Sequence, residues 1–271
     1  MIIHLSNYGL NEILLAFALT LIAGLSTAIG GLIALFAKQT NKQFLSITLG
    51  FSAGVMIYVS FVELFFTANN TLTIELGNNL GPWINLLSFF GGMGLIALID
   101  NFIPEVSNPH EVHDADTKSN RDYNLLRVGV FTALAIAIHN FPEGIATFMA
   151  SLSSPTLAIG VTIAIALHNI PEGISVYVPV YYATGSKKKA FMYSFLSGLA
   201  EPLGAIIGFL VLQPFLSNTL FGIIFAAVAG IMVYISLDEL LPTAHEYGQT
   251  HSAIFGIIAG MAVMAVSMLL F

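Results

Sequence analysis

The chain has 271 residues, of which 56% are hydrophobic and only 8% are charged, and its formal net charge is −7. So small a charged fraction excludes an ordinary soluble globular domain, and it makes the position of each acid more informative than the total. The sequence contains no cysteine, which excludes disulfide bonds and thiolate metal sites. Any bound metal would therefore be held by nitrogen and oxygen atoms.

Apolar runs of about 20 residues recur along the chain, and each is long enough to cross a bilayer as a helix. They predict an all-α integral membrane protein that forms one transmembrane domain over residues 1–271. The first run lacks a basic segment and a cleavage site, so we expect it to be retained as a helix. The eight expected helices cover residues 10–37, 43–68, 82–103, 126–150, 155–183, 189–212, 215–243 and 251–271.

The connection over residues 104–125 is the one long polar segment between expected helices. Histidine-rich tracts can bind metal, although a charged loop is more often simply solvated, and the sequence leaves both interpretations open. The acids and histidines of this loop are His110, Glu111, His113, Asp114 and Asp116.

Basic residues indicate how the chain is oriented in the membrane. All of them fall in or beside the first, third and fifth connections: Lys38, Lys42, Lys118, Arg121, Arg127, Lys187, Lys188 and Lys189. Lysine and arginine mark the cytoplasmic side of multi-pass proteins. We therefore expect a protein of the cell membrane with both termini on the extracytoplasmic side.

Several segments of the chain repeat. AGVMIYVSFVEL from Ala53 resembles AGIMVYISLDEL from Ala229, and AIAIHNFPEG from Ala135 resembles AIALHNIPEG from Ala164. A weaker pair joins GLSTAIGG from Gly24 to GLAEPLGA. In the expected topology the members of each pair cross the membrane in opposite directions. The pattern predicts a 3+2+3 inverted repeat, which is typical of secondary transporters with a site near the bilayer midplane.

The repeated HNxPEG string carries side chains suited to a metal. His139 and Glu143 are four residues apart, so they project from one face of a helix, and His168 and Glu172 do the same on the next helix. Asn140 and Asn169 lie at the edges of these faces. A proline precedes each glutamate, and proline frees a backbone carbonyl of the preceding turn.

The next expected helix adds Glu201, which lies at a similar depth to His139 and His168. Buried carboxylates at the bilayer centre need neutralisation, which one or two divalent cations would supply. Imidazole and carboxylate without thiolate suit Zn²⁺, Fe²⁺, Mn²⁺, Co²⁺ or Ni²⁺ better than Cu⁺ or Ca²⁺. Helix–helix hydrogen bonds or a proton relay would each explain one residue type, but not the recurrence of the whole string.

With these residues in view, the sequence resembles the ZIP family of metal-ion permeases, and most closely its bacterial zinc-uptake branch with paired HNxPEG motifs. The resemblance covers essentially the whole chain. It implies a transporter rather than an enzyme, with metal as transported substrate and no cofactor. It also implies one metal held by His139, Glu143, His168 and Glu172. The second metal would be held by Asn140, Glu143, Asn169, Glu172 and Glu201.

The same resemblance implies a cytoplasmic exit site formed by Asp100, His245 and Glu246, although solvated helix ends would explain these residues equally well. We expect uptake of Zn²⁺, with Fe²⁺, Mn²⁺, Co²⁺ and Cd²⁺ as further substrates, because one such ligand set accepts several metals. The expected partners are the lipid bilayer and divalent ions, with no nucleic acid; a homodimer is compatible with the sequence.

Two alternatives to transport remain at this point. An intramembrane zinc protease would need His-Glu-x-x-His, and the string HEVHD at His110 has the wrong spacing. A metal sensor that does not transport would carry the same motifs. The inverted repeat disfavours both alternatives, because neither requires access from two sides.

Overall fold

A computed structural model describes residues 9–36, 42–102, 118–153, 155–212, 217–248 and 250–270, and these are almost entirely helical, with no strand among them. The all-α class is therefore confirmed. The helices are α1 (Leu10–Ala34), α2 (Lys42–Val59), α3 (Phe65–Phe102), α4 (Lys118–Ser153), α5 (Pro155–Thr184), α6 (Lys187–Gly198), α7 (Ala200–Ile207), α8 (Asn218–Ile235), α9 (Leu241–Tyr247) and α10 (Thr250–Leu270).

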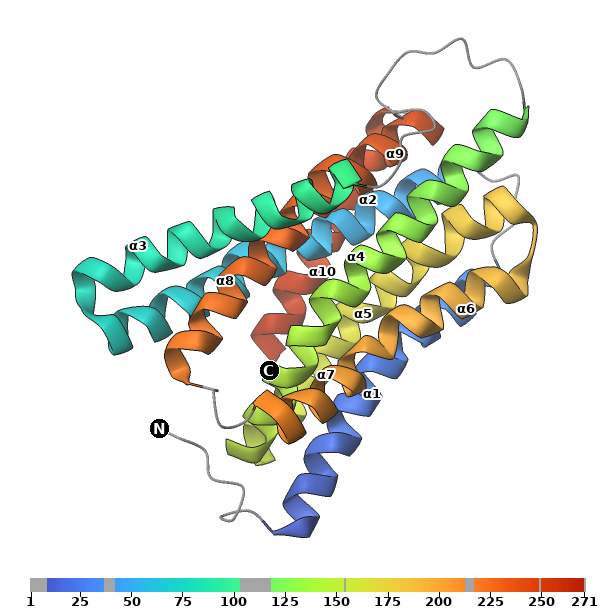
Figure 1. Ribbon diagram of the computed structural model, residues 1–271. Coiled ribbons are helices and arrows are strands. Elements are labelled where there is room, and N and C mark those ends of the chain that lie inside the picture. Colours follow the sequence, from blue (N-terminus) through green and yellow to red (C-terminus); the bar gives the residue numbers. More distant parts are fainter. Residues whose placement is uncertain are drawn as a thin grey trace.

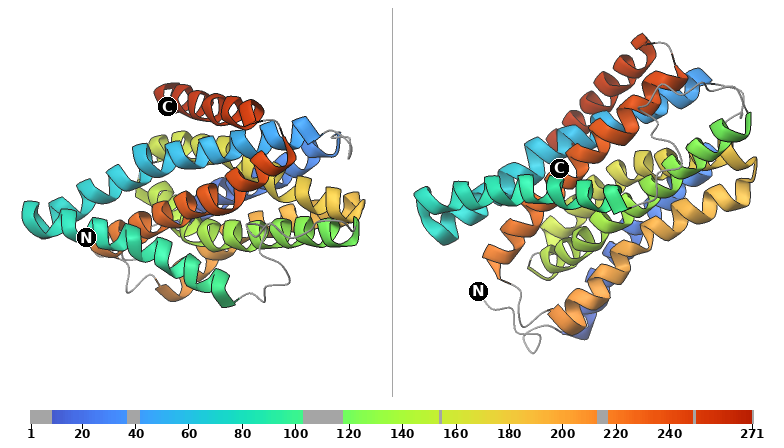
Figure 2. Two further views of the ribbon diagram at one scale, coloured as in Figure 1. Left: turned by 90° about the horizontal axis from the view of Figure 1, so that it is seen from above. Right: turned by 45° about the horizontal axis from the view of Figure 1, so that its top comes forward.

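Six stretches of the described residues are long and apolar enough to cross a membrane, so the chain is a multi-pass membrane protein. Apolar side chains such as Leu14, Phe90 and Phe255 are exposed on the outside of the bundle, where lipid replaces water as their neighbour. In Figure 1, α1, α4, α5 and α6 lie together on one side, and α2, α3 and α8 lie on the other. Figure 2 shows α10 on the outer side of α2, against which it packs.

The stretch from Ser46 to Ile99 is the longest of the six, and it turns back on itself. Gly77 has φ 84° and ψ 165°, a backbone conformation that glycine adopts without the penalty a Cβ would bring. Beyond it, Gly81 lies against the backbone of Leu72, so the two arms of α3 run back side by side (Figure 1). The expected non-helical connection over residues 69–81 was therefore wrong, because one glycine suffices for the reversal.

The expected loop over residues 104–125 was also too long at its C-terminal end, since α4 begins at Lys118. Polar residues such as Asn120 and Asp122 do not prevent the helix from extending beyond the apolar run. Residues 103–117, which include His110 to Asp116, lie outside the described residues.

Two π-helical turns occur at matching positions of the repeated sequence, at Ser60–Leu64 and Ser236–Leu240. Each begins at a buried serine whose hydroxyl donates to the carbonyl four residues earlier. Ser60 Oγ bonds Met56 O at 2.6 Å, and Ser236 Oγ bonds Met232 O at 2.7 Å. Insertions of this kind are frequent at functional sites. They move Glu63 and Glu239 out of the ordinary helical register.

Glycines bring the helices into backbone contact, again at matching positions. A Cβ atom on any of twelve described glycines would overlap a carbonyl oxygen of a neighbouring helix, and eight of these contacts form the four pairs that follow. In corresponding pairs, these contacts are Gly30–Ile170 with Gly204–Phe141, Gly173–Thr27 with Gly144–Glu201, Gly54–Ile257 with Gly230–Phe89, and Gly92–Ala227 with Gly260–Phe51. The last pair adds FFGGM from Phe89 and IIAGM from Ile257 to the repeated segments.

Two neighbouring glycines of α3 test these contacts. A Cβ on Gly92 would overlap the carbonyl of Ala227, whereas nothing lies within 4 Å of one on Gly91. We expect Gly92→Ala to lower the free energy of unfolding by about 1–3 kcal/mol, as overpacking does. Gly91→Ala is the matched control and should be neutral or stabilising by up to about 1 kcal/mol. Thermal unfolding in detergent measures both, and equal melting temperatures would contradict the packing described here.

Candidate metal centre

Prolines interrupt three helices next to the predicted ligands. Pro142 lies inside α4 and Pro171 lies inside α5, each directly before a glutamate. Pro202 follows Glu201, and here the helix is broken between α6 and α7 at Leu199. Because proline has no N–H, the carbonyl four residues earlier loses its helical partner. In the third case that carbonyl belongs to Gly198, and it lies directly against Gly24 of α1.

The two motif asparagines tie α4 and α5 to their neighbours by equivalent hydrogen bonds. Asn140 Nδ2 donates to Ser197 O at 3.3 Å, and Asn169 Nδ2 donates to Ala23 O at 3.1 Å. Ala23 and Ser197 directly precede the repeated GLSTAIGG and GLAEPLGA segments. These acceptors were missed by the sequence analysis, which considered side chains as ligands and not backbone carbonyls. Their place before a repeated segment was the available signal.

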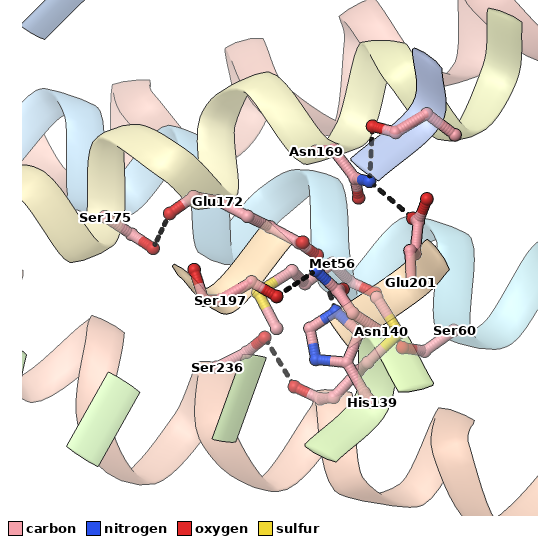
Figure 3. A network of polar contacts seen from close by, with 12 residues as sticks. Met56, Ser60, His139, Asn140, Asn169, Glu172, Ser175, Ser197, Glu201 and Ser236 are labelled. Atoms are coloured by element: carbon pink, nitrogen blue, oxygen red, sulfur yellow. Dashed lines mark hydrogen bonds and ion pairs between the residues drawn. The ribbon is translucent and has the colours of Figure 1, made fainter. Parts of the chain in front are cut away.

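A buried histidine–carboxylate pair joins α4 to α5. His139 Nε2 lies 3.1 Å from Glu172 Oε1, and both side chains are fully buried (Figure 3). Ser175 Oγ donates to the backbone carbonyl of Glu172 at 2.7 Å and supports this turn of α5. Figure 3 shows His139 and Glu172 approaching each other from their two helices.

Glu201 brings a further carboxylate to the same region from α7. Its Oε1 accepts a hydrogen bond of 2.7 Å from Asn169 Nδ2, and the side chain is fully buried. Glu143 is within hydrogen-bonding reach of Glu201, and Glu172 is close enough to interact with it electrostatically. Three helices thus place three carboxylates, one described imidazole and two carboxamides together.

Several buried oxygens of this cluster receive no hydrogen bond from any described residue. They are Asn140 Oδ1, Asn169 Oδ1, Glu172 Oε2 and Glu201 Oε2. Leaving such atoms unpaired inside a protein is costly, so native structures normally supply a donor, a water or an ion. Four acceptor oxygens beside buried carboxylates form a donor set that fits a divalent cation better than an anion or an apolar ligand.

Not every predicted ligand converges. No three histidine, aspartate or glutamate side chains among the described residues are arranged to hold one ion. Instead, His139 pairs with Glu172 Oε1 and Asn169 donates to Glu201 Oε1. His168 is in α5, but its side chain lies outside the described residues, as does that of Asp100 at the end of α3.

The other two residues of the expected exit site lie away from this cluster. His245 and Glu246 are exposed in the last turn of α9.

Comparison with known proteins decides the family. The family model described as ZIP zinc transporter matches residues 104–268, more than half of the chain. The chain belongs to the ZIP family. Proteins named zinc transporter ZupT are similar over nearly their whole length, and they cover nearly all of this chain. The protein from Streptococcus mutans is 62% identical, with 94% of this chain and 97% of its own length aligned.

Two further proteins with the same name are similar to this chain over nearly its whole length. The zinc transporter ZupT of Oceanobacillus iheyensis is 60% identical over 96% of this chain and 99% of its own length. The zinc transporter ZupT of Clostridium perfringens is 58% identical, with 97% of this chain and 98% of its own length aligned. Membership in a transporter family excludes the intramembrane protease that the sequence had left as an alternative.

The unequal bonding of the two asparagines gives a prediction. Removing Asn169 leaves two acceptors, Ala23 O and Glu201 Oε1, without their donor, whereas removing Asn140 leaves only Ser197 O. We expect Asn169→Ala to destabilise the protein by about 2–4 kcal/mol and Asn140→Ala by about 1 kcal/mol. Thermal unfolding in metal-free detergent buffer compares them. A larger loss for Asn140→Ala would show that this network is placed incorrectly.

Proposed function

We propose that this protein imports Zn²⁺ and related divalent transition-metal ions across the cell membrane. The observation that carries the proposal is the buried cluster at α4, α5 and α7. It combines the His139–Glu172 pair, the Glu201 carboxylate and four acceptor oxygens without a described donor. A passing divalent cation would satisfy these groups together. The names of the relatives, zinc transporter ZupT, support Zn²⁺ as a substrate.

For the ligands, we propose that His139, Glu143, His168 and Glu172 hold one ion. Glu143 and Glu172 would be shared with a second ion bound by Asn140, Asn169 and Glu201. The proximity of Glu143 and Glu172 to Glu201 supports the sharing of carboxylates. Binding would break the His139–Glu172 pair and the Asn169–Glu201 hydrogen bond. Contacts between these side chains and the cation would replace both interactions.

The range of metals follows from the type of ligand. Imidazole and carboxylate accept Zn²⁺, Fe²⁺, Mn²⁺, Co²⁺ and Cd²⁺, whereas Cu⁺ prefers the thiolates that this sequence lacks. Selection among these ions would depend on geometry and on metal availability.

We further propose eight transmembrane helices in a 3+2+3 inverted repeat that forms one domain over residues 1–271. The four corresponding pairs of glycine contacts support it, because they join equivalent positions throughout the chain. The matching π-helical turns and the Asn140 and Asn169 hydrogen bonds support it as well. A site between two related halves can be opened first to one side of the membrane and then to the other.

From the distribution of basic residues, we propose that both termini lie outside and that the α5–α6 connection lies inside. The lysines at the start of α6 are exposed, as an interfacial position requires. Metal would then leave toward the cytoplasm past Asp100, His245 and Glu246. We expect a homodimer as the assembly, with lipid around it.

The ligand assignment predicts the effect of neutralising Glu172. In vesicles containing the protein, Glu172→Gln should lower Zn²⁺ uptake at least about 100-fold, because a buried carboxylate ligand is worth several kcal/mol to a bound cation. The amide keeps the size of the side chain, so the protein should still fold.

Glu75→Gln is the matched control. Glu75 is exposed in α3, where it accepts a hydrogen bond from Asn218, and the amide oxygen can keep that bond. This variant should transport as the parent does. Normal Zn²⁺ uptake by folded Glu172→Gln protein would rule out the proposed site.

The proposed orientation has its own test, because the chain contains no cysteine that would need to be removed first. A single cysteine introduced as Lys188→Cys should react with an impermeant maleimide only when the cytoplasmic face is accessible. A cysteine introduced as Asn79→Cys, near the α3 reversal, should react from outside. The opposite labelling pattern would invert the proposed topology and the direction of transport.

A further inference from the structure

Thr27 of α1 occupies the position that corresponds to Glu201. It is the fourth residue of GLSTAIGG, as Glu201 is of GLAEPLGA. The two side chains begin in equivalent places. A Cβ atom on Gly198 would lie 2.9 Å from Thr27 Cβ, and one on Gly24 would lie 3.1 Å from Glu201 Cβ. Both side chains are fully buried.

The backbones around these residues correspond too. The carbonyl of Thr27 lies against Gly173 of α5, and the carbonyl of Glu201 lies against Gly144 of α4. The backbone of Glu201 therefore contacts α4, whereas its side chain accepts a hydrogen bond from Asn169 of α5. By the same correspondence, the Thr27 side chain is directed to the half of the centre that contains Asn140.

The hydroxyl of Thr27 has no hydrogen-bond partner among the described residues. Inside a helix a threonine hydroxyl commonly bonds the carbonyl four residues earlier, and Thr20 of the same helix does so, to Ala16 O at 2.9 Å. The carbonyl of Thr27 is itself engaged, since it accepts from Ser194 Oγ at 2.9 Å. The free oxygens Thr27 Oγ1 and Asn140 Oδ1 are therefore both buried polar atoms that need a partner.

We propose that Thr27 is a specificity-determining residue that supplies a neutral oxygen to the transported cation on the Asn140 side of the centre. This inference rests on the proposed function. Where the repeat has a carboxylate at Glu201, Thr27 provides a ligand atom without charge. The centre thus has a carboxylate from each motif, Glu143 and Glu172, but only one further carboxylate, Glu201, at its edge.

The absence of a carboxylate at Thr27 would affect how fast the cation is released. A further carboxylate would strengthen the binding of every divalent cation in this low-dielectric interior, and it would slow release by the same factor. It would also shift preference toward harder ions such as Mn²⁺, which favour carboxylate oxygen. A hydroxyl assists binding but leaves the ion able to depart.

Three substitutions in proteoliposomes test the role of Thr27, with initial rates of Zn²⁺ uptake measured over a range of concentrations. Thr27→Val keeps the shape and removes the oxygen, so KM should rise about 5- to 10-fold, the loss of one modest ligand contact. Thr27→Ser keeps the oxygen and should stay within about twofold of the parent. Thr27→Glu should lower both KM and the maximal rate about tenfold and let Mn²⁺ compete better.

Thr73→Val is the matched control, because Thr73 Oγ1 also lacks a described partner but lies in α3 beside the Gly77 reversal. Its KM should equal that of the parent. Zn²⁺ binding to each detergent-purified variant, measured by titration calorimetry, should change in the same direction as KM. Because Thr27→Val removes no hydrogen bond, its melting temperature should not fall.

The inference is overturned if Thr27→Val and Thr27→Glu both retain the parent's KM, Zn²⁺ affinity and Mn²⁺ competition. Should Thr27→Val fold poorly, the comparison of Thr27→Ser with Thr27→Glu decides the question by the same criteria. Glu172→Gln, measured in the same experiment, tests the proposed function independently of Thr27. If Glu172→Gln loses Zn²⁺ uptake while the Thr27 variants behave as the parent does, only the role of Thr27 is refuted.

Discussion

Polar groups buried among membrane-spanning helices must find partners within the protein, because lipid offers none. In this chain that constraint is concentrated where α4, α5 and α7 meet. Prolines free carbonyls there, asparagines bind the carbonyls of Ala23 and Ser197, and His139 pairs with Glu172. Acceptor oxygens still exceed the described donors. A divalent cation is the ligand that would balance such a centre, and the transport proposed here follows from that imbalance.

Close packing of the helices makes this arrangement possible. Glycines at twelve described positions let carbonyls of neighbouring helices approach to backbone contact. In lipid, where burying apolar surface between helices gains little, such contacts and interhelical hydrogen bonds hold the bundle together. Four pairs of these contacts join corresponding positions of the repeated segments, which supports the proposed inverted repeat. The two halves differ where Thr27 replaces a carboxylate.

The sequence predicted the helical class and the position of the buried polar cluster. Ionisable residues within apolar runs are rare, so the twin HNxPEG strings pointed to the region where the structure has its buried polar cluster, and the helical class followed from composition. The reversal at Gly77 was missed, because a single glycine gives no loop-like composition. The extension of α4 to Lys118 was missed as well, because polar residues can continue a helix beyond the membrane.

The anchoring of Asn140 and Asn169 to backbone carbonyls could not be predicted, because it depends on three-dimensional register and not on residue type. The pairing of His139 with Glu172 across two helices likewise needs the crossing geometry of α4 and α5. The repeat was visible in the sequence, and it aligns Thr27 with Glu201. The equivalent contacts around these two residues are visible only in the structure.

Anomalous scattering from crystals soaked in Zn²⁺ tests the central claim most directly, because it locates the ions and identifies their ligands together. The account predicts a zinc peak among His139, Glu172 and Glu201, within bonding distance of at least two of these side chains. Zinc bound at full occupancy only at exposed groups such as His245 and Glu246, with none at the buried centre, would contradict it.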